Sequence, residues 1–126
     1  MKKNEAVKYD SEKLLRQLIP PSLHRAVAVV FTYGSKKYAP RNWEKGTEWG
    51  RYYRAAMGHL EDFWEGKDFD DDTGLPTLWH AACCLTILIE YFECHLGTDD
   101  RARRERTDFS ERIKAALVKE QHEPTR

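Results

Sequence analysis

The segment that follows Pro76 constrains the fold most, because it is apolar on almost every side when it is drawn as a helix. Pro76 favours a helix start, and Gly97 is suited to end the helix just after Leu96. The apolar residues are Leu78, Ala81, Ala82, Leu85, Leu88, Ile89 and Phe92. A helix with this pattern leaves little of its surface for water, so we expect it at the centre of a bundle or buried by a second subunit.

The other apolar segments also have the spacing of amphipathic helices. Residues 22–34 predict one helix, in which Gly34 fits a C-terminal cap, and residues 51–65 and 107–121 predict two more. The expected buried side chains are Leu23, Val27, Val30 and Phe31 in the first helix and Tyr53, Ala56, Leu60, Phe63 and Trp64 in the second. No segment shows the alternation of a strand, so the sequence predicts an all-α fold.

Length and charge limit the remaining possibilities. The chain has 126 residues, which predicts a single domain, 1–126, with its core over about 9–97 and a charged helix or tail over 98–126. The 21 basic residues balance the 21 acidic ones, which argues against a nucleic-acid partner. No apolar run is long enough for a membrane span. The chain has three cysteines, an odd number, and they form no CxxC pair. This indicates reduced thiols and hence the cytoplasm.

Charge is unevenly distributed along the chain. Residues 36–54 are rich in lysine and arginine, and residues 65–72 are rich in aspartate and glutamate. Two adjacent blocks of opposite charge could simply pair and keep the surface hydrated. The alternative is a site that binds phosphates on a basic wall and a divalent metal on an acidic one.

Asp68, Asp70 and Asp72 are metal-ligand candidates because a loop with alternating carboxylates can direct several oxygens toward one hard cation. The spacing resembles the first half of an EF-hand, but Thr73 replaces the turn glycine and Trp79 replaces the closing glutamate, so that assignment is rejected. The simpler interpretation is a hydrated turn in which Asp72 or Thr73 caps the next helix.

Histidines provide a second set of candidates. His59 flanks the apolar face of its helix, and His80 lies on the apolar helix beside Cys84. Two histidines on neighbouring helices can bind a metal or act as acid and base, although each could also be a hydrogen-bonded core residue. The adjacent Cys83 and Cys84 predict core packing. Five other carboxylates on these helices could also bind a metal, but their positions favour a solvent-facing orientation: Glu61, Asp62, Glu65, Glu90 and Glu93.

Several short motifs resemble those of a known phage family. They are Leu18-Ile19-Pro20-Pro21, Tyr33-Gly34-Ser35-Lys36-Lys37-Tyr38, Arg41-Asn42-Trp43-Glu44-Lys45-Gly46, His59-Leu60, Gly66-Lys67-Asp68-Phe69-Asp70, Gly74-Leu75 and His80-Ala81. In this order, over roughly residues 9–95, they resemble the phage dATP/dGTP diphosphohydrolases of the MazZ type. These proteins are related to the all-α MazG-like nucleotide pyrophosphohydrolases.

The resemblance implies a compact MazG-like helical bundle that hydrolyses purine deoxynucleoside triphosphates to the monophosphate and pyrophosphate with a divalent metal. In phages that replace adenine by 2-aminoadenine, such an enzyme supplies dGMP and depletes dATP. It would act in the cytoplasm of the host cell. The apolar helix and the small size also lead us to expect a homodimer or homotetramer.

We hypothesise that one or two Mg²⁺ or Mn²⁺ ions polarise the α-phosphate and activate the attacking water. The expected metal ligands are His59, Asp68, Asp70, Asp72 and His80, and the expected catalytic residues are His59, Asp70 and His80. The expected substrate-binding residues are Lys36, Lys37, Tyr38, Arg41, Asn42, Trp43 and Lys45. Among these, the cations would hold the phosphates and Trp43 or Tyr38 would stack on the base.

Other functions remain open at this stage. An HD-type triphosphohydrolase would release nucleoside and triphosphate, although the sequence lacks the adjacent His-Asp pair of that class. A non-catalytic helical protein that dimerises through residues 76–96 would show no turnover. The products formed from each nucleoside triphosphate distinguish these possibilities.

Overall fold

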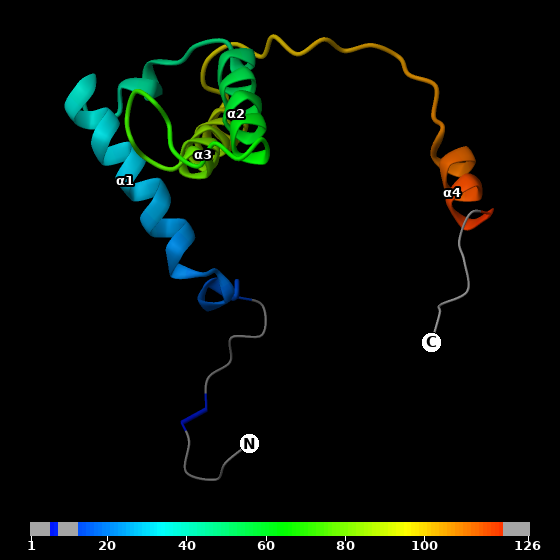
Figure 1. The fold of residues 1–126 in the computed structure, drawn as a ribbon, viewed down its shortest axis with the longest axis horizontal. Coiled ribbons are helices and arrows are strands. Elements are labelled where there is room, and N and C mark those ends of the chain that lie inside the picture. The colour runs from blue at the N-terminus through cyan, green and yellow to red at the C-terminus, as the bar shows by residue number, and fades with distance from the viewer. Residues whose placement is uncertain (1–5, 8–12, 120–126) are drawn as a thin grey trace.

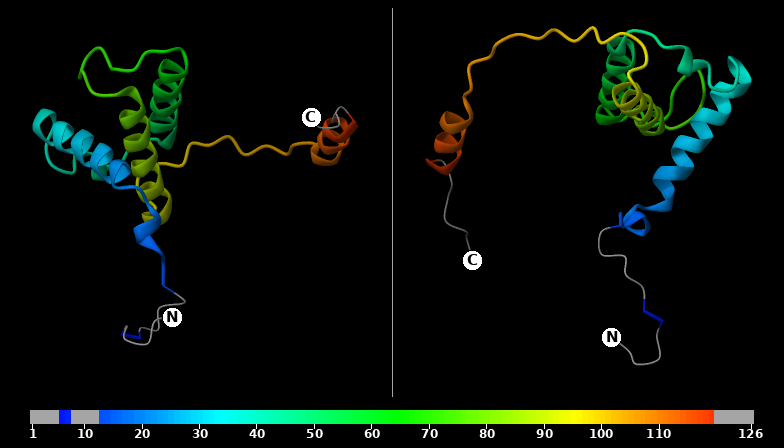
Figure 2. Two further views of the ribbon diagram at one scale, coloured as in Figure 1. Left: turned by 60° about the horizontal axis from the view of Figure 1, so that its bottom comes forward. Right: turned by 180° about the vertical axis from the view of Figure 1, so that it is seen from behind.

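The computed structural model describes residues 6–7 and 13–119, and Figures 1 and 2 show how they are arranged. In this part of the chain the structure has helices and only isolated β-bridges. The elements are η1 (Arg16–Leu18), α1 (Pro21–Lys37), η2 (Asn42–Lys45), α2 (Trp49–Trp64), α3 (Thr77–Cys94) and α4 (Ser110–Lys119). The predicted all-α fold is confirmed. None of the described helices combines the length and the apolar character needed to cross a membrane.

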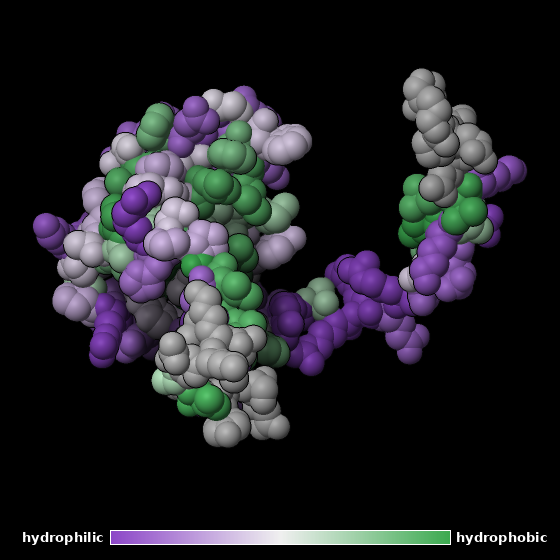
Figure 3. Space-filling model, turned by 90° about the horizontal axis from the view of Figure 1, so that it is seen from below, coloured by the Kyte–Doolittle hydropathy of each residue, from purple (hydrophilic) through white to green (hydrophobic). Residues whose placement is uncertain are grey.

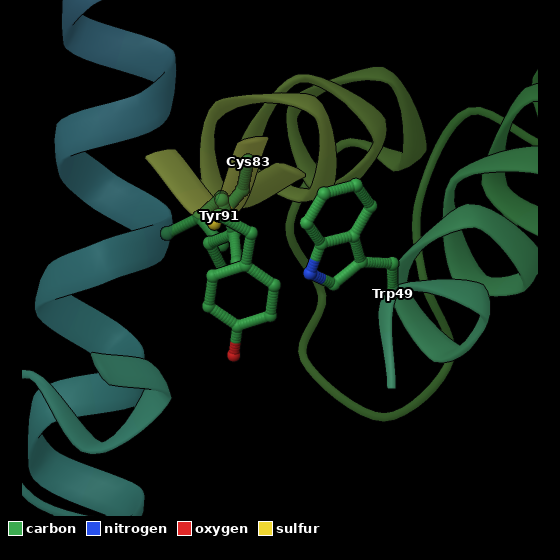
Figure 4. Close-up of a cluster of buried hydrophobic side chains, with 5 residues drawn as sticks. Trp49, Cys83 and Tyr91 are labelled. Carbon is green, nitrogen blue, oxygen red and sulfur yellow. The ribbon is translucent and has the colours of Figure 1, made fainter. Parts of the chain in front are cut away.

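α3 lies between α1 and α2 and packs against both, as its apolar sequence predicts (Figure 1). The core forms where the three helices meet and contains Val30, Trp49, Cys83, Ile87 and Tyr91. In Figure 4, Tyr91 projects from α3 between α1 and the indole of Trp49, which comes from α2. Cys83 and Cys84 are both buried, so the predicted role in core packing is confirmed.

One side of α3 remains open to solvent. The open side carries the exposed residues Leu78, Leu85, Ile89 and Phe92. These residues follow one another at intervals of seven, four and three residues, so they lie on one face and form an apolar stripe along the helix. In the described residues, α3 is thus covered by α1 and α2 on two sides and has a third, uncovered apolar side.

The buried face predicted for α2 is wrong in part. Tyr53 is 61% exposed and Trp64 is 86% exposed, whereas Trp49 and Ala56 are buried. The inward face contains Trp49, Ala56 and the half-buried Tyr52 and His59. The error arises because α2 has apolar residues on two adjacent faces, and only one of these faces contacts α3.

The predicted end of the first helix at Gly34 is also wrong. α1 continues through Gly34 to Lys37, and the N–H of Tyr38 still donates to the carbonyl of Gly34. Gly34 has an ordinary helical backbone and does not act as a cap. The extension matters because it places Lys37 at the end of a rigid helix.

The acidic segment between α2 and α3 is held by specific hydrogen bonds. Thr77 is completely buried, and its hydroxyl donates to the carbonyl of Lys67 over 2.9 Å. Oδ2 of Asp70 accepts the N–H groups of Asp72 and Thr73, each over 3.0 Å. The turn is therefore closed by Asp70. The alternative in which Asp72 or Thr73 caps α3 is wrong, because the N-cap is Pro76 and has no side-chain hydrogen bond.

The chain after α3 returns to the start of α2. Thr98 donates its N–H to Thr47 and accepts the N–H of Trp49, and Nε1 of Trp49 donates to the carbonyl of Leu96 over 2.7 Å. The chain then extends away from the body to α4, which the pattern over 107–121 predicts (residues 120 and 121 lie outside the described part). In Figure 3 the connecting segment is hydrophilic and α4 carries a hydrophobic patch.

Gly97→Ala is expected to destabilise the fold by about 2 kcal/mol or more. Gly97 has φ +69°, where a side chain is strained, and an added Cβ would collide with the carbonyl oxygen of Thr47. Urea unfolding measures the change. Gly58→Ala is the matched control, because its Cβ would meet no atom within 4 Å, and it should leave stability unchanged or raise it by up to about 1 kcal/mol. Equal midpoints for the two variants would contradict the prediction.

Candidate functional site

A cavity of about 400 Å³ lies between the end of α1, the η2 segment and the first turns of α3. Five of the predicted substrate-binding residues line it, namely Lys37, Tyr38, Arg41, Asn42 and Trp43. The same cavity is also lined by His80 of α3 and by Thr73 of the turn before α3, which come later in the sequence. The structure thus brings together the basic segment, the end of the acidic turn and one predicted catalytic histidine.

Two predicted substrate residues lie elsewhere. Lys36 does not line the cavity, because it points from a different side of α1 than Lys37 does. Lys45 borders a neighbouring cavity, also of about 400 Å³, together with Arg51. Asn42, Trp43 and Tyr52 line both cavities and form the partition between them.

The basic wall combines a rigid and a strained element. Lys37 lies at the end of α1, with Nζ 5.3 Å from the ring centroid of Tyr38. Tyr38 raises the pKa of Lys37, with smaller contributions from Tyr33 and Asp72, so this lysine stays protonated. Arg41 has φ +58°, a left-handed conformation that is uncommon for a residue with a Cβ. Both side chains are exposed and can reach an anion in the cavity.

Aromatic rings form the second wall. The ring centroid of Trp43 lies 6.0 Å from that of Phe31 and 6.3 Å from that of Tyr91. Such distances are typical of packed aromatic pairs. The hydroxyl of Tyr91 also donates to the carbonyl oxygen of Trp43 over 2.6 Å. Trp43 is therefore half-buried and still borders the cavity, as stacking on a base would require.

His59 of α2 and His80 of α3 face each other across the helix pair. Their ring centroids are 5.0 Å apart and the rings are nearly parallel, with an interplanar angle of 23°. Nε2 of His80 lies 2.7 Å from the hydroxyl of Thr73, which also accepts the N–H of Leu75. The acidic turn thus orients His80 through Thr73.

Burial sets the charge of His80. Loss of water lowers the pKa of His80, the proximity of His59 lowers it further, and Asp70 only partly opposes this. The imidazole is therefore neutral near pH 7 and can accept a proton. Burial alone would raise the pKa of Asp70, but the N–H groups of Thr73 and Asp72 outweigh it, so the pKa of Asp70 is lowered and the carboxylate is charged.

We expect folding stability to fall as the pH drops below about 6.5, the usual pKa of histidine. Because the pKa of His80 is lowered in the folded state, the unfolded chain binds a proton first in this window, and acid favours unfolding. Urea midpoints measured between pH 7.5 and 5 test this for the wild type and for His80→Gln, which cannot titrate. If His80→Gln loses as much stability as the wild type between pH 7.5 and 5, the loss does not come from protonation of His80.

The predicted metal ligands do not form one cluster. Among the described residues, no group of three or more His, Cys, Asp or Glu side chains is placed to hold a metal ion. His59 and His80 form a pair, and Oδ2 of Asp70 is engaged by backbone N–H groups. Asp68 and Asp72 are exposed and do not line the cavity. The site as it stands does not fit a resident metal centre, and the metal stays a prediction.

Some residues that border the cavity or support it carry no sequence pattern that predicts a site role. Thr73 and Tyr52 line the cavity, and Tyr91 packs behind Trp43. Tyr52 lies one position before the predicted apolar face of α2, and only the true orientation of that helix would have identified it. No local pattern links Tyr91 to Trp43, because they are far apart in the sequence.

Comparisons with known proteins identify relatives of this chain. A family model described as dATP/dGTP diphosphohydrolase, N-terminal, matches residues 3–101, a range that contains every cavity residue named above. A protein of Salmonella phage PMBT28 named dATP/dGTP diphosphohydrolase is 33% identical over 95 residues, which cover 75% of this chain and 32% of that protein. The chain thus spans about a third of that relative's length. No solved structure matches the chain. The resemblance seen in the sequence motifs is confirmed, and the chain belongs to the dATP/dGTP diphosphohydrolase N-terminal family.

Proposed function

We propose that this protein hydrolyses purine deoxynucleoside triphosphates, dGTP or dATP, to the monophosphate and pyrophosphate. The observation that carries the proposal is the cavity in which Lys37, Arg41 and Trp43 meet the neutral His80. The two cations can bind a triphosphate, the aromatic ring can stack on its base, and the imidazole can accept a proton from an attacking water. The name of the phage relative supports the same substrate class.

The proposed chemistry is attack of water on the α-phosphorus. His80 accepts the proton of the water, since its lowered pKa keeps the imidazole neutral. The bond from the α-phosphorus to the bridging oxygen of the β-phosphate breaks, and pyrophosphate leaves. Lys37 and Arg41 stabilise the charge that accumulates on the leaving group, with Arg41 as a planar fork and Lys37 as a point charge.

We further propose that Mg²⁺ or Mn²⁺ arrives bound to the triphosphate. Mg²⁺ in proteins is often held by one or two carboxylates together with substrate phosphates, which does not require a preformed cluster. The acidic turn borders the cavity through Thr73, whose N–H donates to Oδ2 of Asp70 and whose hydroxyl lies 2.7 Å from Nε2 of His80. Asp70 and Asp72 are the carboxylates proposed to contact such a complex.

The decisive experiment incubates the protein with each deoxy- and ribonucleoside triphosphate, with and without Mg²⁺ or Mn²⁺, and resolves the products. Monophosphate and pyrophosphate from dGTP or dATP support the proposal, and dCTP and dTTP are the controls. A role in 2-aminoadenine metabolism requires turnover of both purine substrates. Nucleoside plus triphosphate would instead identify an HD-type activity, and no turnover with any substrate would favour the non-catalytic alternative.

We also propose a homo-oligomer formed through the open face of α2 and α3. Both helices expose apolar side chains, among them Tyr53, Trp64, Leu85 and Ile89. A two-helix face of this kind can pair with a second copy of itself about a twofold axis, and the pairing buries the exposed apolar side chains of α2 and α3. Light scattering coupled to gel filtration would give a dimer or tetramer, and a monomer at all concentrations would overturn this part of the proposal.

A further inference from the structure

We propose that Tyr91 is a positioning residue that holds the cation-bearing segment 38–46 in its substrate-binding conformation. This inference rests on the proposed function. Tyr91 does not line the main cavity, and its side chain is completely buried in α3. It acts instead through Trp43, whose carbonyl oxygen accepts its hydroxyl over 2.6 Å.

The segment has few other connections to the rest of the protein. Its remaining backbone hydrogen bonds are local: Tyr38 to Gly34, Asn42 to Ala39, Glu44 to Arg41 and Gly46 to Trp43. The ion pair between Arg41 and Glu44 is also local. Among the described residues, the Tyr91 hydroxyl makes the single hydrogen bond that joins segment 38–46 to α2 or α3.

The conformation held in this way is not one that the segment would adopt by itself. Arg41, two residues before Trp43, has the left-handed backbone with φ +58° and ψ +26°. Such a conformation is unfavourable for a residue with a Cβ and persists where surrounding contacts enforce it. Anchoring of Trp43 therefore also determines where Arg41 and Asn42 enter the cavity.

The ring of Tyr91 is held firmly enough to serve as an anchor. It contacts Tyr52 edge to face, with a centroid distance of 5.6 Å and an interplanar angle of 84°, and it lies 6.3 Å from the ring of Trp43. Tyr91→Phe preserves these ring contacts and removes only the hydroxyl. The backbone carbonyl of Trp43 then loses its partner, and the segment gains mobility without collapse of the core.

Tyr91→Phe is expected to raise KM for dGTP by about threefold to tenfold, because the variant loses one hydrogen bond. The value of kcat should stay within about twofold of the wild type. A purely structural role would instead lower the active fraction and hence kcat, with KM unchanged. Hydrogen exchange followed by mass spectrometry provides a second measurement, in which amides of residues 39–46 should exchange faster in the variant. Tyr53→Phe is the matched control and should change neither quantity, because Tyr53 lies outside the cavity and the variant keeps the ring on the proposed oligomer face.

The two measurements separate the possible failures. If the wild type hydrolyses no nucleotide, the proposed function fails, and exchange of residues 39–46 still tests the anchor. If exchange in Tyr91→Phe matches the wild type, the anchor is refuted. If exchange accelerates but KM is unchanged in an active enzyme, the segment is anchored without positioning the substrate, and the proposal is overturned.

Discussion

Replacement of His80 by glutamine should reduce kcat for dGTP hydrolysis by about a hundredfold or more, the usual contribution of a positioned proton acceptor. Glutamine can still hydrogen-bond to the hydroxyl of Thr73, so the turn keeps its contact with α3, but an amide cannot accept the proton of water. The loss should appear mainly in kcat. Steady-state kinetics on folded protein, checked by circular dichroism, measure it.

His24→Gln is the matched control for this experiment. His24 lies on the exposed surface near the start of α1 and does not line the cavity, so its replacement should leave kcat and KM unchanged. The pH profile gives an independent check, since wild-type activity should decline as His80 becomes protonated in acid. An active His80→Gln enzyme with an unaltered pH profile would remove His80 from the mechanism.

Arg41→Ala should raise KM for dGTP by about tenfold to a hundredfold, as expected for the loss of charged hydrogen bonds to phosphate. Alanine retains the Cβ, so the left-handed backbone is no more and no less strained than in the wild type. The metal dependence should stay the same, because Arg41 has no ligand atoms for a cation. Titrations of Mn²⁺ at saturating nucleotide separate the two effects.

Arg54→Ala serves as the control for this variant, because it removes an exposed cation of α2 that does not line the cavity. Arg41→Lys should recover only part of the affinity, since a lysine has no planar fork for two phosphate oxygens. If Arg41→Ala and Arg54→Ala raise KM equally, the effect is general electrostatic attraction and the phosphate contact is disproved.

The sequence predicted the helices better than it predicted their orientation. Apolar spacing reveals that residues share a face, but α2 has two adjacent apolar faces. The one with Tyr53 and Trp64 is open, while the one with Trp49 and Ala56 packs on α3. Glycine is also common at helix ends, which is why Gly34 suggested one. The helix nevertheless continues through Gly34, whose backbone does not adopt a left-handed conformation.

The site was predictable where neighbouring residues act together and not where distant ones do. The basic and aromatic residues from Lys37 to Trp43 stand close in the sequence, so their shared cavity follows from one short segment. The directions of Asp68 and Asp72 depend on the bonds that Thr77 and Asp70 make across the turn. Residue spacing alone does not encode such bonds.

The cavity takes its walls from two neighbouring segments, the end of α1 and η2, and from the start of α3, which comes much later in the chain. A nucleotide that touches all three would have to dissociate before the chain could unfold. The resulting stabilisation grows with the logarithm of free ligand concentration above Kd. If the proposed function is correct, resistance of this protein to degradation would track the supply of the proposed nucleotide substrate, and a depleted pool would leave it more vulnerable to proteases.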